Sequence, residues 1–111
     1  MKLMVFVLNK VDVLNFLLED MSKAGIKGAT IINSTGMAMT LARQENSFIG
    51  SSLRAFFEVD RDDNRTILAV IHDDQLEIIR QVITDVVGDL SLPNTGILFT
   101  VPLDFVEGIR E

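Results

Sequence analysis

The chain has 111 residues, 48% of them apolar, and a formal net charge of −6. The length suits a single domain over residues 1–111, and the apolar fraction is sufficient for a buried core. The acidic balance argues against general nucleic-acid binding and against docking on an anionic membrane, because both need a basic surface. No apolar run reaches the roughly 18 residues of a spanning helix, so we expect no membrane insertion.

The first part of the chain follows the order strand, helix, strand. Residues 2–9 form an apolar strand, and Asp12 is placed to cap a helix that runs to about Ala24. The apolar positions of this helix recur at i, i+3, i+4 and i+7, as expected for one buried stripe: Leu14, Leu17, Leu18 and Met21. Gly25 ends the helix, and residues 28–34 form the second strand.

Residues 37–64 form a long connection with weaker signals. Short helical pieces are expected near residues 37–43 and 51–57, and a turn at residues 60–64. The arginines of this region could bind an acidic partner, but interspersed acids favour a mixed solvated surface; they are Arg43, Arg54, Arg61 and Arg65. Phe56 and Phe57 are expected to pack against a neighbouring subunit. A connection of this length is usually functional.

The last part repeats the order strand, helix, strand. Residues 66–71 form the third strand, and Asp74 with Glu77 resembles a capping box for a helix that runs to about Val87. Gly88 ends that helix. The turn at residues 93–96 leads into the fourth strand, residues 97–101, and residues 103–109 could form one helical turn.

This order predicts an α+β, ferredoxin-like βαββαβ fold, with an antiparallel four-stranded sheet and two helices on one face. The strands at residues 3–8 and 67–71 are apolar on both faces. Two helices cover one face of such a sheet, so a second element must cover the other. We expect that element to be another copy of the chain, which makes the protein a homo-oligomer.

The sequence contains no cysteine and one histidine. The absence of cysteine excludes disulfides and thiolate metal sites and fits a reducing cytoplasm, where we place the protein. A single histidine and the lack of a suitable carboxylate pair leave no convincing catalytic set, so we expect no enzymatic activity and no catalytic residue.

Several segments, in this order, resemble the nitrogen regulatory P-II superfamily: residues 1–2, 24–30, 36, 73–76, 96–102 and 109–110. The resemblance implies a signalling protein that forms a homotrimer with its sheets packed inward. It also implies nucleotide binding in clefts between subunits, and a loop at residues 37–64 that docks on a target such as a transporter or a metabolic enzyme. Together with the turn before the last strand, the resemblance indicates five ligand-binding residues: Gly36, Asn94, Gly96, Arg110 and Thr30.

The chain departs from the family pattern at four places. Ile97 stands where P-II proteins carry a basic residue that contacts phosphate, and Gly108 stands in place of a tail arginine. Thr40 replaces a glutamine that supports metal and oxo-acid binding, and the loop lacks the tyrosine that is covalently modified. These departures predict an altered ligand, with an adenine nucleotide as one candidate.

Two alternatives remain open at this point. The first is a divalent-cation-binding trimer of the same fold, with ligands at residues 60–64 or 72–74. For residues 72–74 a strand end followed by a helix cap is the favoured interpretation, because successive strand residues point in different directions. We therefore expect no metal site. The second alternative is a purely structural oligomerisation module.

Overall fold

The computed structural model describes residues 1–44 and 63–109. The elements follow the order β1 (Lys2–Leu8), the 3₁₀ turn η1 (Val11–Val13), α1 (Leu14–Lys23), β2 (Thr30–Ser34), α2 (Met37–Ala42), β3 (Asn64–Ile71), the 3₁₀ turn η2 (Asp73–Gln75), α4 (Leu76–Val86) and β4 (Gly96–Pro102). The predicted βαββαβ order is confirmed, and α2 lies in the long connection.

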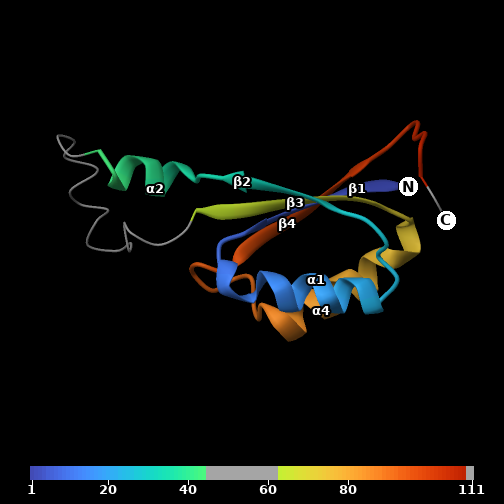
Figure 1. Ribbon diagram of the computed structural model, residues 1–111, viewed down its shortest axis with the longest axis horizontal. Helices are drawn as coiled ribbons and strands as arrows, with labels where there is room; N and C mark the ends of the chain where they lie inside the picture. Colours follow the sequence, from blue (N-terminus) through green and yellow to red (C-terminus); the bar gives the residue numbers. More distant parts are fainter. Residues whose placement is uncertain (45–62, 110–111) are drawn as a thin grey trace.

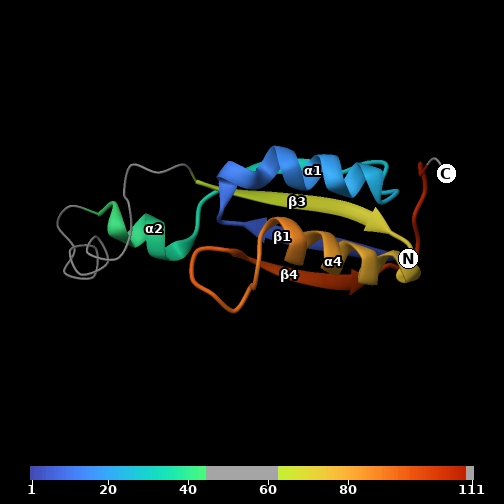
Figure 2. The same ribbon diagram turned by 90° about the horizontal axis from the view of Figure 1, so that it is seen from below.

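The four strands form one antiparallel sheet in the order β2-β3-β1-β4. Both α1 and α4 lie on the same side of this sheet (Figures 1 and 2). The fold is therefore the predicted ferredoxin-like α+β arrangement. The N-terminus lies at one end of the sheet, and α2 extends beyond the other end (Figure 1).

The core lies between the sheet and the two helices. Alternate residues of β1 point toward the helices, and Met4, Phe6 and Leu8 are fully buried there. The apolar stripes of the two helices meet them, with Leu17 and Met21 from α1 and Ile79, Val82 and Ile83 from α4. Period 2 in the strand and period 3.6 in the helices thus place one face of each element in the same core.

The opposite face of the sheet is apolar and open in the single chain. In each strand every second side chain points away from the helices, and the register places these side chains next to one another across β3, β1 and β4. Ile97, Phe99 and Val101 on β4 are 58%, 47% and 42% exposed, and Val70 on β3 is exposed as well. We call this surface the open face. Its exposure agrees with the expectation that a second element covers it.

The starts of both long helices differ from the prediction. Asp12 makes no cap hydrogen bond; it lies inside η1, and α1 begins two residues later at Leu14 without a side-chain cap. The capping box before α4 is formed by His72 and Gln75 instead of Asp74 and Glu77, and the Gln75 side chain accepts the His72 backbone N–H at 2.8 Å. A 3₁₀ turn precedes each helix and moves the cap toward the N-terminus.

The predicted turns and the first short helix are confirmed. Gly25, Gly88 and Asn94 have positive φ angles of 98°, 102° and 59°, and α2 falls within residues 37–43. The expected helical turn at residues 103–109 is wrong, because that tail is irregular. The expectations for residues 51–57, and for Arg54, Arg61, Asp60 and Asp62, lie outside the described residues.

Candidate functional site

The predicted ligand-binding residues lie on opposite edge strands of the sheet. Gly36 follows the end of β2, whereas Asn94 and Gly96 lie at the start of β4. Thr30 begins β2 on the cross-strand row that runs through the middle of β1 and β4. Arg110 lies outside the described residues. The structure therefore divides the described candidates into two groups, Thr30 and Gly36 at the β2 edge and Asn94 and Gly96 at the β4 edge.

The register gives the separation of these groups. Thr30 lies on the same cross-strand row as Phe99, three strands away. Gly96 is three residues along β4 from that row. With about 4.8 Å between strands and about 3.3 Å per residue, the Cα atoms of Thr30 and Gly96 are about 17 Å apart. One chain alone does not bring them together.

A pocket of about 760 Å³ lies beside the start of β2 and the last residues of β3. Its walls come from the segment between α1 and β2, the open face of β3 and the C-terminal tail, with Lys27, Gly28, Thr30, Leu68, Val70 and Ile109 among its lining residues. β2 pairs with β3 from Thr30 onward, so residues 25–29 diverge from β3 and leave this space. The lining combines polar residues with apolar ones, as in many ligand sites.

The turn before β4 is fixed by backbone requirements. A Cβ at Gly96 would lie 2.7 Å from the Val7 carbonyl oxygen and 2.8 Å from the Phe6 ring, closer than Cβ contacts allow. Asn94 adopts the left-handed conformation, which asparagine tolerates better than most residues. Gly96 thus has a structural role at the edge of the core, whatever ligand contacts it makes.

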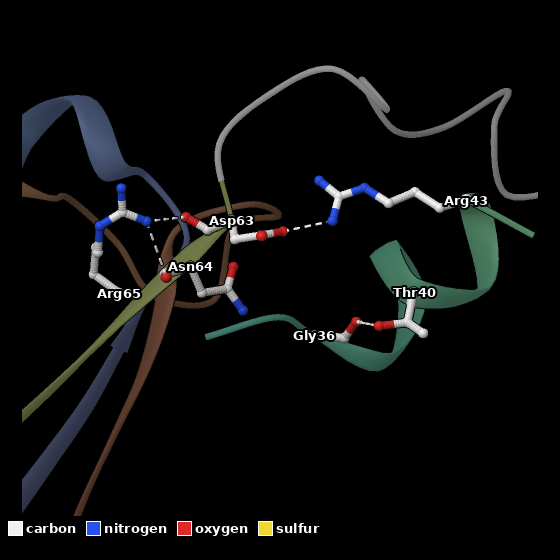
Figure 3. Close-up of polar contacts among 6 residues, drawn as sticks. All are labelled: Gly36, Thr40, Arg43, Asp63, Asn64 and Arg65. Carbon is white, nitrogen blue, oxygen red and sulfur yellow. Dashed lines mark hydrogen bonds and ion pairs between the residues drawn. The ribbon is translucent and has the colours of Figure 1, made fainter. Parts of the chain in front are cut away.

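A polar cluster joins the two ends of the long connection (Figure 3). The Arg43 guanidinium donates to Asp63 Oδ1 at 2.7 Å, which ties the end of α2 to the start of β3. Arg65 donates to the backbone carbonyl oxygens of Asp63 and Asn64 at 2.8 and 3.2 Å. We call Arg43, Asp63 and Arg65 the loop-base cluster.

The loop-base cluster determines the charge at this end of the sheet. The hydrogen bond from Arg43 is the largest of the effects that hold the pKa of Asp63 below its usual range, and the charges of Arg43 and Arg65 add to it. Asp63 is therefore ionised at neutral pH. The three groups together sum to one positive charge. Nearby, Thr40 Oγ1 donates to the Gly36 carbonyl oxygen at 3.0 Å, so the Thr40 hydroxyl stabilises the start of α2.

Sequence reasoning missed two parts of this arrangement. It treated Arg43 and Arg65 as members of a solvated surface and did not pair either with Asp63, since 20 residues separate Arg43 from Asp63. It also missed the pocket, although Thr30 was selected. The glycines of the segment 25–28 were a usable signal, because small residues allow a ligand to approach the backbone.

Residues 72–74 form the end of a strand and the start of a helical turn. His72 serves the capping box of η2. Within residues 1–44 and 63–109, no group of three or more His, Cys, Asp or Glu side chains is spaced to hold a metal ion. Among the same residues, no helix has both the length and the apolar character needed to cross a membrane.

Comparison with known proteins gives one family. The family model described as nitrogen regulatory protein P-II matches residues 1–111, the whole chain. No curated protein matches the chain. P-II proteins are regulators and not enzymes, and they are generally trimers that interact with partner proteins. The full-length match, together with the ferredoxin-like sheet, shows that this chain belongs to the P-II family of nitrogen regulatory proteins.

Proposed function

We propose that this protein is a non-catalytic, trimeric regulator of the cytoplasm, built from a single domain, that binds a small effector between subunits. The effector controls a partner protein, such as a transporter or a metabolic enzyme, through the connection at residues 37–64. Candidate effector contacts are Asn94 and Gly96 from one subunit, and Gly36, Thr30 and Arg110 from another.

The division of the site carries this proposal. The two groups of candidate residues lie about 17 Å apart in one chain, on the opposite edge strands β2 and β4. A neighbouring copy packed on the open face brings the β2 edge of one subunit to the β4 edge of the next. A ligand held there contacts both groups and depends on the assembly.

The open face supports assembly by its composition. Phe99, Ile97 and Val101 expose large apolar side chains on one continuous surface of β4, and β1 and β3 extend it. Monomeric proteins rarely leave contiguous apolar surfaces of this kind in water. Burial against like surfaces stabilises the assembly by roughly 25 cal/mol per Å² of apolar area.

The pocket at Thr30 fits a nucleoside-sized group. Its volume of about 760 Å³ is within the range of sites for small organic ligands. Leu68 and Val70 offer apolar contact to a planar ring, while the Thr30 hydroxyl and the backbone of residues 27–29 offer hydrogen bonds. An adenine nucleoside or nucleotide combines these two requirements.

The route from effector to partner passes through the loop base. Gly36 directly precedes α2, and the Arg43–Asp63 ion pair joins the end of α2 to β3. An effector at Gly36 therefore lies next to the segment that carries residues 45–62. It changes the equilibrium of that segment to the extent that it binds one arrangement more tightly than the other.

Isothermal titration with adenosine, cyclic AMP, AMP, ADP and ATP tests effector binding. We expect at least one ligand to bind with one site per chain. Thr30→Val removes the hydroxyl and keeps the shape of the side chain, so affinity should fall about fivefold, the effect of one hydrogen bond of about 1 kcal/mol.

Thr84→Val is the matched control, because the Thr84 hydroxyl is bonded to the Arg80 carbonyl on the outer side of α4. It should leave binding unchanged. Absence of binding by all five ligands at millimolar concentration would reject the nucleotide effector, and equal losses in both threonine variants would reject the assignment to the pocket.

A further inference from the structure

The helix α2 is too short to be stable by itself. It has six residues, Met37–Ala42, and it extends beyond the end of the sheet (Figure 1). Nucleation of a helix has a high cost in free energy, so isolated helices shorter than about 12 residues are marginal in water. Burial of the Met39 and Ala42 side chains stabilises α2 in part. A helix of this length is also sensitive to the contacts at its two ends.

Both ends of α2 are attached to the sheet. At its start, the chain arrives from β2 through Gly36, and the Thr40 backbone N–H and hydroxyl both donate to the Gly36 carbonyl oxygen at 3.0 Å. At its end, Arg43 donates to Oδ1 of Asp63, which directly precedes β3, at 2.7 Å (Figure 3). The first attachment is the chain itself, whereas the second is an ion pair between residues 20 positions apart.

Asp63 is held in place for its contact with α2. Arg65 donates to the carbonyl oxygens of Asp63 and Asn64 at 2.8 and 3.2 Å, which fixes the backbone where β3 begins. Arg43 and Arg65 lie on either side of Asp63 (Figure 3). The hydrogen bond from Arg43 is the largest cause of the lowered pKa of Asp63, and a hydrogen bond from the Thr35 side chain also lowers it. The carboxylate thus interacts with the chain on both sides of α2.

We propose that the Arg43–Asp63 ion pair is a latch that keeps the last turn of α2 folded at the start of β3. With the latch closed, α2 ends at a defined position relative to the sheet. With the latch open, the last turn of α2 unfolds more readily. Transitions between order and disorder in a short segment are a common basis of regulation. The latch requires neither an effector nor a partner protein, so this inference goes beyond the proposed function.

Amide hydrogen exchange, measured by NMR on the protein without ligand, tests the latch. The Arg43 and Gln44 backbone N–H groups report on the end of α2, because they donate to the Met39 and Leu41 carbonyl oxygens at 3.1 Å. Asp63→Ala removes the carboxylate. We expect it to lower the protection factors of both amides about threefold, the factor that corresponds to an exposed ion pair. The amides of α4 should keep their protection.

Variants at Arg43 separate the charge from the shape of the helix. Arginine, lysine and glutamine have similar helix propensities, so exchanges among them change the helix little by themselves. Arg43→Gln should lower the protection of the Gln44 amide about threefold, as Asp63→Ala does. Arg43→Lys keeps the charge and should retain most of the protection. In the double variant of Arg43→Gln and Asp63→Ala, the second change should add little, because the contact is already lost.

Glu77→Gln is the matched control, because it breaks an exposed ion pair of the same kind, with Arg80 on α4. It should leave the protection of the α2 amides unchanged. A loss in only one of the variants Arg43→Gln and Asp63→Ala would overturn the inference, and a loss in Arg43→Gln alone would assign the effect to the helix dipole. An equal loss in the amides of α4 would show general destabilisation and would overturn it as well. Effector binding enters none of these measurements, so the proposed function is tested separately.

Discussion

Gly96 shows how a residue selected for ligand contact also serves the core. A Cβ at this position would collide with the Phe6 ring and the Val7 carbonyl oxygen, at the point where β4 begins beside the end of β1. Phe6 is fully buried, so the ring cannot move away without disturbing the surrounding core. The absence of a side chain at position 96 is therefore a packing requirement.

Gly96→Ala should destabilise the fold by about 1–3 kcal/mol, the usual cost of inserting a methyl group into a packed region. Urea denaturation followed by circular dichroism measures this change. Gly28→Ala is the control, because a Cβ at Gly28 meets no atom within 4 Å, and its effect should stay within about 0.5 kcal/mol. Equal stability of the two variants would contradict the packing argument.

At the scale of elements, periodicity predicted the strands and helices well and their capping poorly. The apolar stripe of α1 is a local property, and the structure buries Leu17 and Met21 and partly buries Leu14 and Leu18, as predicted. The cap of α4 depends on where the strand before it ends. A 3₁₀ turn places the capping box at His72 and Gln75, although Asp74 and Glu77 have the more common residue types.

The site was less predictable than the elements because it depends on residues distant in sequence. Thr30 could be selected, but the pocket around it requires the tail and β3 as well. The Arg43–Asp63 pair joins residues on either side of the segment 45–62. No short-range pattern in the sequence specifies which of the several arginines and carboxylates in this region will meet.

The Arg43–Asp63 pair predicts a pH dependence at the loop base. The folded-state pKa of Asp63 is lowered, so the pair contributes to stability above the unfolded-state pKa of about 3.8, and this contribution is lost as the pH falls through the folded-state value. Arg43→Gln should raise the pKa of Asp63, as measured by NMR titration of its carboxyl carbon. Its loss of stability relative to the wild type should disappear once the pH has fallen through the lowered folded-state pKa of Asp63.

Arg80→Gln is the matched control for this titration. Arg80 forms an exposed ion pair with Glu77 on α4, so its removal should leave the titration of Asp63 as it is in the wild type. An unchanged pKa of Asp63 in Arg43→Gln would show that the ion pair does not form in solution. The charge assigned to the loop base would then need revision.

At the scale of the whole molecule, the open face and the net negative charge have opposite effects on assembly. One side of the sheet is filled by α1 and α4, while the open face carries large apolar side chains in water (Figure 1). The net charge of −6 works against association at long range, so the gain on assembly has to come from apolar burial over a limited area. A single charge introduced in that area should therefore have a large effect.

Phe99→Glu places a carboxylate at the middle of β4 on the open face, where a neighbouring copy would bury it without a partner. Light scattering should report a mass near three times 12.3 kDa for the wild type and near 12.3 kDa for this variant at micromolar concentration.

Phe16→Glu makes the same change on the exposed side of α1, where Phe16 is 65% exposed, and should keep the wild-type mass. Because Phe99 points away from the core, its replacement should leave the helical circular dichroism signal intact, so a change of mass can be separated from unfolding. A wild-type protein that remains monomeric under these conditions would contradict both the trimer and the site shared between its subunits, since the β2 and β4 edges would then have no means of meeting.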